Sequence, residues 1–468
     1  MHAVLTYIVL FLSLLMFFVK REHKVCLLII YMLCFNGVSL PVLGNIISPL
    51  FCFFLSELFH YKQYYRVFKK TDIKYPLIIL LLGIIILAIS SPHIEGANGI
   101  KDLFLDQFIR RYGIIFFVIV ASLSMKSQKP MIVVTFVCLL LLTGFGLLNL
   151  VTKHAIYIDW VITSADSDSV FAEAGSKYTY DERFRVQSMF ASPFDYGYAC
   201  LMLLLYYLYL LKGRLIGRKI FYIAVACCSF GIVTCGCRTL LACLIIGGII
   251  YAIFAYDFNS KIKLALSALF ILFSIILVMP DEFSKQVSFL SSAFTDDQTV
   301  GGSSITMRQT QTAAVIYYIQ NDMVLGRGYG FFNDDLGWSE GPSGAVDRDL
   351  FGLEGVYMNL LLERGIVGLV LYALYWITLI WITCSIYKKA RDKKTLALNL
   401  SVIGSYLAFA NMTGELSSVP ITLTLIGLSS GYALKKRSAK RILKSELSKE
   451  GEKASALNAN KTISHATV

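Results

Sequence analysis

The chain has 468 residues, of which 56% are hydrophobic and only 16% are charged. Soluble domains carry about 25% charged residues, so this composition excludes an ordinary soluble protein and indicates that lipid surrounds much of the chain. The net charge of +12 does not indicate a nucleic-acid partner, because the Lys and Arg residues lie mainly between apolar runs.

Continuous apolar runs follow one another along the chain, each about as long as a membrane-spanning helix. Because these runs do not alternate with polar residues, they exclude a barrel of strands. We therefore predict an all-α polytopic integral membrane protein with one transmembrane domain, residues 1–434, and about 12 or 13 spanning helices. The predicted runs are 3–19, 25–41, 43–59, 75–91, 109–125, 131–151, 194–211, 219–235, 239–256, 262–279, 364–386, 395–412 and 417–434.

The distribution of basic residues predicts how the chain is oriented. The first run lacks a preceding basic segment and a small-residue cleavage site, so we expect a spanning helix rather than a signal peptide. Short basic connections alternate with longer, less basic loops, which places the N-terminus outside and the C-terminus in the cytoplasm. We expect the basic tail, 435–468, to be cytoplasmic and disordered. The basic connections are 20–24, 60–74, 126–129, 212–219, 256–263 and 387–394.

Two external loops, 152–193 and 280–363, are too long to be simple connectors. Loops of this length tend to be functional or disordered. Both contain stretches of helical character, and in the second loop Ser303 or Ser304 could cap a helix through Thr306–Ile319.

Arginine residues in or beside these loops are the first candidates for chemistry, since a planar guanidinium group matches phosphate oxygens in pairs. A single such Arg is explained equally well by pairing with loop carboxylates, but a converging set favours binding of a diphosphate without a metal. Arg238 stands between two apolar runs, where a charge is expensive and indicates function, unless it extends to the membrane interface. The arginines of this set are Arg183, Arg185, Arg238, Arg308, Arg327, Arg348 and Arg364. The candidates for diphosphate binding among them are Arg183, Arg185, Arg238, Arg308 and Arg327.

Glu354 and Tyr357 are the candidates for a catalytic pair. If helical, residues three apart share one face, and a partly buried carboxylate could take a proton from a sugar hydroxyl. The alternative for a lone Glu is a solvated loop side chain. Asp347-Arg348-Asp349 is too short a pattern to predict a metal site, and we expect no metal and no cofactor.

Four segments of the chain, in order, resemble the O-antigen polymerase and ligase superfamily, the Wzy and WaaL type proteins. They are similar to the family's arginine-phenylalanine-proline segment, its glycine-serine-arginine-threonine helix start and its arginine helix with a glycine-rich turn. The last is similar to its histidine-asparagine-x-tyrosine-leucine and glutamate-x-glycine-x-x-glycine block. The segments are Arg185 to Gly197, Gly236 to Thr239, Arg308 with Leu325 to Gly330, and Glu354 to Gly368. Each motif is weak by itself, and their order and the predicted topology give the resemblance its specificity.

The resemblance implies a glycosyltransferase-C-like membrane protein in a bacterial inner (plasma) membrane. It implies an enzyme that uses oligosaccharides linked to undecaprenyl diphosphate and works with membrane lipid and, as a candidate partner, a chain-length regulator protein. Glu354 stands where ligases commonly carry histidine, which favours a polymerase. A ligase that moves finished glycan to another acceptor, and a lipid-linked sugar flippase or transporter, stay open as alternatives.

Overall fold

A computed structural model describes most of the chain. The described residues are 2–35, 38, 48–70, 72–91, 96–162, 179–180, 183–262, 305–336, 350, 353, 355–414 and 419–437. Residues 263–279 of the predicted run 262–279 and the tail beyond residue 437 lie outside them. The described part is helical except for one antiparallel pair of two-residue strands, β1 (Thr179–Tyr180) and β2 (Arg183–Phe184).

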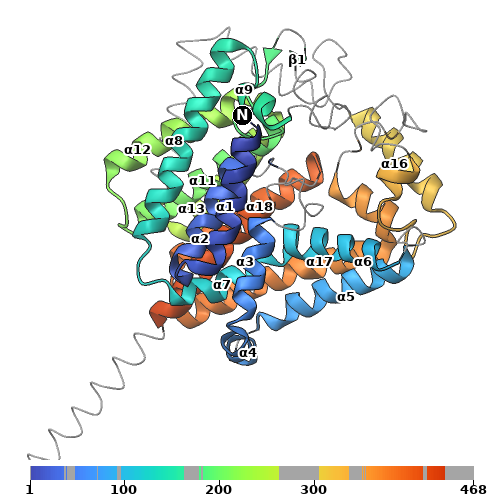
Figure 1. The fold of residues 1–468 in the computed structure, drawn as a ribbon, viewed down its shortest axis with the longest axis horizontal. Helices are drawn as coiled ribbons and strands as arrows, with labels where there is room; N and C mark the ends of the chain where they lie inside the picture. Colours follow the sequence, from blue (N-terminus) through green and yellow to red (C-terminus); the bar gives the residue numbers. More distant parts are fainter. Residues whose placement is uncertain are drawn as a thin grey trace, which may run out of the picture.

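The helices of the N-terminal half lie beside the longer helices of the C-terminal half (Figure 1). The first group is α1 (His2–Phe18), α2 (Arg21–Ile30) with the π-helical η1 (Tyr31–Phe35), α3 (Pro49–Leu58), α4 (Tyr61–Lys70), α5 (Lys74–Ser90), α6 (Gly96–Phe104), the π-helical η2 (Leu105–Tyr112), α7 (Ile114–Ser124), α8 (Lys129–Thr152) and α9 (Ile156–Ile162). The second is α11 (Pro193–Lys212), α12 (Arg218–Thr234), α13 (Arg238–Ala255), α16 (Ile305–Ile319), η4 (Phe331–Asp335), α17 (Val356–Ala390), α18 (Lys393–Met412) and the helix 419–437.

Within the described residues, five helices are long and apolar enough to cross a membrane, namely α8, α11, α13, α17 and α18. A sixth span would be the pair α4 and α5, which is bent by 110°. These findings agree with a multi-pass helical membrane protein. The total of 12 or 13 spans stays a prediction.

Two predicted runs form shorter helices than expected. The run 109–125 is divided at Gly113, whose backbone N–H donates to Phe108 O at 2.7 Å and closes a π-helical turn. A side chain at Gly113 would lie 2.4 Å from that same oxygen, so the chain turns there and α7 starts afresh at Ile114. The run 43–59 yields only α3, which begins at Pro49 behind the N-cap Ser48.

Helices α11 and α18 form the centre of the described fold. Burial reaches 78% of the apolar window in α11 and 67% in α18, against 28% in both α13 and α17. Small residues let neighbouring helices approach closely, since a Cβ at Gly247 of α13 would lie 2.2 Å from Ser405 Oγ of α18. The Ser405 hydroxyl also donates to Cys243 O at 3.1 Å. Because only 28% of the apolar window is buried in α13 and in α17, these two helices expose much of their apolar surface.

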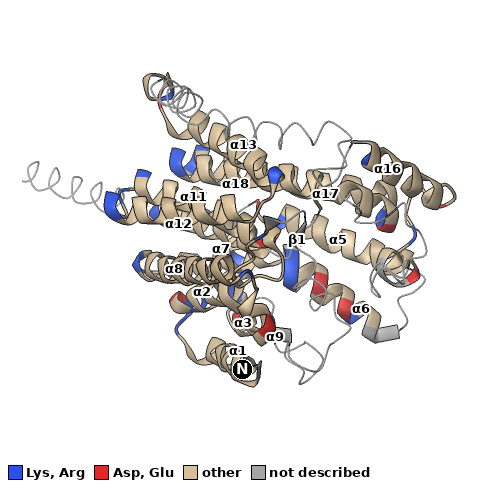
Figure 2. Ribbon diagram, turned by 90° about the horizontal axis from the view of Figure 1, so that it is seen from above, with Lys and Arg blue, Asp and Glu red and all other residues tan. Residues whose placement is uncertain are grey.

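The short basic connections meet at one end of the helices, which we call the basic face (20–24, 60–74, 126–129, 212–219, 387–394 and 435–437). Lys389 pairs with Asp72 at 3.4 Å, and Lys435 donates to Met125 O. Figure 2 shows Lys and Arg gathered where α8 and α12 begin and α11 ends. The opposite face carries the starts of α11, α13 and α17 and the end of α18.

Candidate functional site

The segment before α11 brings Arg185 to the face opposite the basic one. The Val186 N–H donates to Thr234 O at 3.0 Å, which fixes the segment against the end of α12. The Ser192 hydroxyl accepts from Phe194 N and caps α11, whose first residue is Pro193 as predicted. The Arg185 guanidinium lies 5.9 Å from the centre of the Phe194 ring. The hydrogen bond of Val186 and the contact with the Phe194 ring therefore hold Arg185 beside the start of α11.

Arg238 is the first residue of α13 and lies beside the Arg185 segment. The turn before it needs Gly236, which has a φ of 64°. A Cβ at Gly236 would lie 3.2 Å from Arg185 Cγ, so the two parts of the chain are in contact. The predicted helix start at Arg238 is confirmed, and the positive end of the α13 dipole adds to its charge.

Arg308 of α16 joins the same region through the end of α18. Its Nη2 donates to Met412 O at 2.8 Å, where the carbonyl groups at the helix end carry partial negative charge. The next residue, Thr413, donates to the Thr239 hydroxyl beside Arg238 at 3.0 Å. We call Arg185, Arg238 and Arg308 the arginine junction, because Arg185 lies against the turn before Arg238 and Arg308 is bound at the end of α18 beside Thr239.

The predicted catalytic pair is only half described, because Glu354 lies outside the described residues. Helix α17 begins at Val356, and Gly355 before it has a φ of 92°. The conditional prediction that residues 354 and 357 share a helical face stays a prediction. A Cβ at Gly355 would lie 3.1 Å from Asn411 O and 2.8 Å from the Tyr357 ring. The start of α17 with Tyr357 therefore borders the arginine junction.

The other two predicted arginines have different surroundings. Arg183 belongs to β2 and pairs in register with Tyr180, two residues before Arg185. Arg327 donates to Asp322 Oδ2 at 2.7 Å and lies 5.1 Å from the Phe331 ring centre. Its backbone N–H binds Leu362 O, about two turns along α17 from the arginine junction. The structure therefore groups three of the five arginines and leaves Arg327 with a carboxylate of its own.

The glycine-rich turn 323–330 is joined to the middle of α17 by backbone contacts. Gly326 and Gly365 have φ values of 72° and 58°, and a Cβ on either would lie within 2.6 Å of the other segment's backbone. Four backbone hydrogen bonds connect the two segments: Arg327 N to Leu362 O, Gly328 N to Glu363 O, Ile366 N to Met323 O and Val367 N to Val324 O. Two motifs that are well separated in the sequence are thus one structural unit.

A polar group beside this unit joins Glu363 and Arg364, which lie in the segment Glu354 to Gly368, to Asp106 and Gln107, which no sequence motif includes. Arg364 Nη2 donates to Gln107 Oε1 at 2.8 Å, and the Tyr329 hydroxyl donates to Asp106 Oδ2 at 3.3 Å. Glu363 is buried and accepts from Gly330 N at 3.3 Å. The signal for this polar group in the sequence is the pair Asp106-Gln107 immediately before an apolar run.

Burial raises the pKa of Glu363 to about 7, opposed by the nearby charges of Arg364 and Arg111. A hydrocarbon thickness of about 30 Å corresponds to about 20 helical residues. The apolar part of α17 that follows Gly365 meets this length, so Glu363 lies just outside it.

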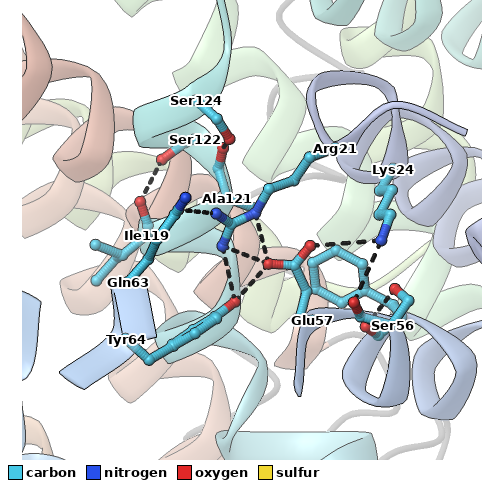
Figure 3. Close-up of polar contacts among 11 residues, drawn as sticks. Arg21, Lys24, Ser56, Glu57, Gln63, Tyr64, Ile119, Ala121, Ser122 and Ser124 are labelled. Atoms are coloured by element: carbon cyan, nitrogen blue, oxygen red, sulfur yellow. Dashed lines mark hydrogen bonds and ion pairs between the residues drawn. The ribbon is translucent and has the colours of Figure 1, made fainter. Parts of the chain in front are cut away.

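A second buried charge cluster lies near the basic face (Figure 3). Arg21 Nε donates to Glu57 Oε2 at 2.7 Å, and the Tyr64 hydroxyl donates to the same oxygen at 2.6 Å. Lys24 Nζ lies 3.8 Å from Glu57 Oε1, and the Glu57 side chain is fully buried. The charges of this cluster are paired across α2, α3 and α4, so removing one partner would leave an uncompensated buried charge.

No group of three or more His, Cys, Asp or Glu side chains suited to a metal occurs among the described residues. Known protein families include none that matches the chain, and curated proteins give no match either. The arginine junction is therefore judged on its own geometry: three guanidinium-bearing segments at the ends of α11, α13 and α18, with the chemistry to bind a multiply charged anion.

Proposed function

We propose that the chain is a membrane glycosyltransferase that polymerises oligosaccharide repeat units linked to undecaprenyl diphosphate. The observation that carries this proposal is the arginine junction, where residues 185, 238 and 308 come from separate segments to one place. Guanidinium groups on neighbouring segments match the charge of a diphosphate leaving group, and stabilising such a charge is usually a large catalytic contribution.

In the proposed reaction a sugar hydroxyl of the acceptor attacks the anomeric carbon of the donor. The bond from that carbon to the diphosphate oxygen breaks, its electron pair stays on the diphosphate, and configuration is inverted. Arg185, Arg238 and Arg308 stabilise the departing charge, and Glu354 takes the hydroxyl proton. Tyr357, at the start of α17 beside Asn411, orients the sugar.

The proposed site faces away from the cytoplasm of a bacterial cell. The positive-inside rule places the basic face in the cytoplasm, which puts the arginine junction and the N-terminus outside. In this orientation the enzyme meets its lipid-linked substrates at the outer surface of the plasma membrane, where it would act with a chain-length regulator.

The test is polymer formation from purified lipid-linked repeat units by Arg308→Ala and Arg238→Ala variants. We expect each to lose about 100-fold to 1000-fold in rate, as when a charge-stabilising donor is removed, while staying in the membrane. Arg218→Ala is the matched control, since Arg218 also begins a helix but lies on the basic face. Normal chain-length ladders from both test variants would contradict the proposal.

Glu354→Gln tests the base separately. It should slow turnover more than it weakens donor binding, because the amide cannot accept the proton. An unchanged rate would remove Glu354 from the mechanism. Transfer of finished polymer to an acceptor without a lipid diphosphate would favour the ligase instead, and movement of intact lipid-linked sugar across vesicles would favour a flippase.

A further inference from the structure

A half-open pocket lies between α5, η2 and α17. It contains about 550 Å³ of empty space, part of which opens to the surroundings. Apolar side chains of α5 and α17 form most of its wall, while Ser90, Gln107 and Arg364 lie at one end. The pocket therefore combines a long apolar part with a short polar and positively charged end.

Arg364 is incompletely satisfied within the described residues. One nitrogen donates to the neutral amide oxygen of Gln107, and its buried Nε has no hydrogen-bond partner. The carboxylate of the neighbouring residue, Glu363, accepts from Gly330 N instead. A buried guanidinium donor without an acceptor is costly, and an anion bound at the pocket end would remove that cost.

Two glycines keep the pocket open. A Cβ at Gly83 would meet only Leu371 Cδ1, at 3.8 Å, so the space beyond it is free of close neighbours. A Cβ at Gly368 would lie 2.1 Å from Arg364 Cβ, so this glycine leaves room for the arginine to extend along α17. A larger side chain at Gly83 would occupy the apolar part without touching the charged end.

Exposed apolar side chains flank the pocket on both helices. Leu82 and Ile85 of α5 are 46% and 54% exposed, and Val370 and Leu374 of α17 are 50% and 41% exposed. In a membrane these surfaces face hydrocarbon, so a chain can enter the pocket sideways from the bilayer. A ligand with a hydrocarbon chain and an anionic head matches both parts.

We propose that this pocket is a second lipid-phosphate site, which holds a polyprenyl diphosphate with its phosphate at Arg364 and its chain between α5 and α17. This assignment rests on the proposed function, in which donor and acceptor are both lipid-linked. Arg364 lies about 12 Å along α17 from Val356 at the arginine junction. A short oligosaccharide on the acceptor lipid could bridge that separation, so we assign the pocket to the acceptor.

The experiment measures binding of a photoreactive polyprenyl diphosphate without sugar to the purified full chain, so that no turnover is involved. We expect Arg364→Gln and Gly83→Leu each to weaken crosslinking to α5 and α17 peptides about tenfold or more. Arg364→Lys should restore part of the binding. Gly144→Leu is the matched control, because a Cβ at Gly144 of α8 meets nothing within 4 Å.

The outcomes separate this inference from the proposed function. Wild-type binding by both Arg364→Gln and Gly83→Leu would overturn the pocket assignment, even where the arginine-junction variants lose polymer. Equal competition by phosphatidylglycerol would also overturn it, since the site would then accept any anionic lipid. Crosslinking in the pocket that both variants weaken would support the site, even if the wild-type chain made no polymer. The lack of polymer would then contradict only the proposed function.

Discussion

Gly365 is the position where a single added methyl group should have the largest local effect. Its φ of 58° and ψ of −161° lie in a region that is essentially restricted to glycine, and other residues there cost about 1–3 kcal/mol. In Gly365→Ala the new Cβ would also lie 2.5 Å from the carbonyl of Val324, which is backbone and cannot rotate away. We therefore expect the turn 323–330 to separate from α17.

The size of the effect follows from the strain that the added Cβ puts into the closed turn. The hydrogen bonds that opening breaks, such as those from Ile366 N to Met323 O and from Val367 N to Val324 O, are the same in both proteins and do not add to it. Because 1.4 kcal/mol is about a factor of ten, a strain of about 1–3 kcal/mol should make the opened turn about 5-fold to 100-fold more populated.

Limited trypsin digestion in detergent measures this opening directly, since Arg327 lies in the turn and its side chain is 39% exposed. When opening is fast relative to cleavage, the cleavage rate tracks the open population. Gly144→Ala is the control, because an added Cβ there meets no neighbour and Ala favours a helix. Cleavage after Arg327 at the wild-type rate in Gly365→Ala would refute this account of the turn.

Two further predictions concern buried carboxyl groups. Glu57→Gln leaves Arg21 and Lys24 without their carboxylate and should cost about 3–5 kcal/mol of stability, seen as a lower unfolding temperature. Asp102→Asn, in an exposed ion pair, is the control and should leave the unfolding temperature unchanged. Equal unfolding temperatures for the two variants would contradict the prediction. Burial raises the pKa of Glu363 to about 7, so its stabilising contribution is complete below its ordinary pKa of 4.5 and is lost as pH rises through about 7. Glu363→Gln should flatten the unfolding temperature between pH 5 and pH 8, and an unchanged pH profile would mean that another group titrates there.

Local signals predicted several helix boundaries correctly. Pro193 behind Ser192 begins α11, Arg238 begins α13, and the expected helix Thr306–Ile319 is α16. Capping residues and helix-compatible prolines act within a few residues, so a single sequence contains the information needed to place these starts. The convergence of Arg185, Arg238 and Arg308 was harder to predict, and the resemblance to a family, rather than periodicity, suggested it.

The features that sequence reasoning missed depend on contacts between distant segments. The break at Gly365 is visible only once the turn at Gly326 is packed against it. The hairpin of β1 and β2 has two residues in each strand, too few to show an alternating pattern. Gln107 and Arg364, which meet at 2.8 Å, are more than 250 positions apart, and nothing in either local sequence indicates the other.

The hydrogen bonds of the glycine-rich turn decide how an anion can bind near it. Such a turn could in principle hold phosphate with its backbone N–H groups. Here the N–H groups of residues 327 and 328 donate to α17 carbonyls, that of Tyr329 donates to the Ser91 hydroxyl at 2.7 Å, and that of Gly330 donates to Glu363. Four consecutive backbone donors are therefore already used within the protein. An anion in this region must be bound by side chains, and Arg364 at the end of the pocket is the guanidinium group placed to bind it.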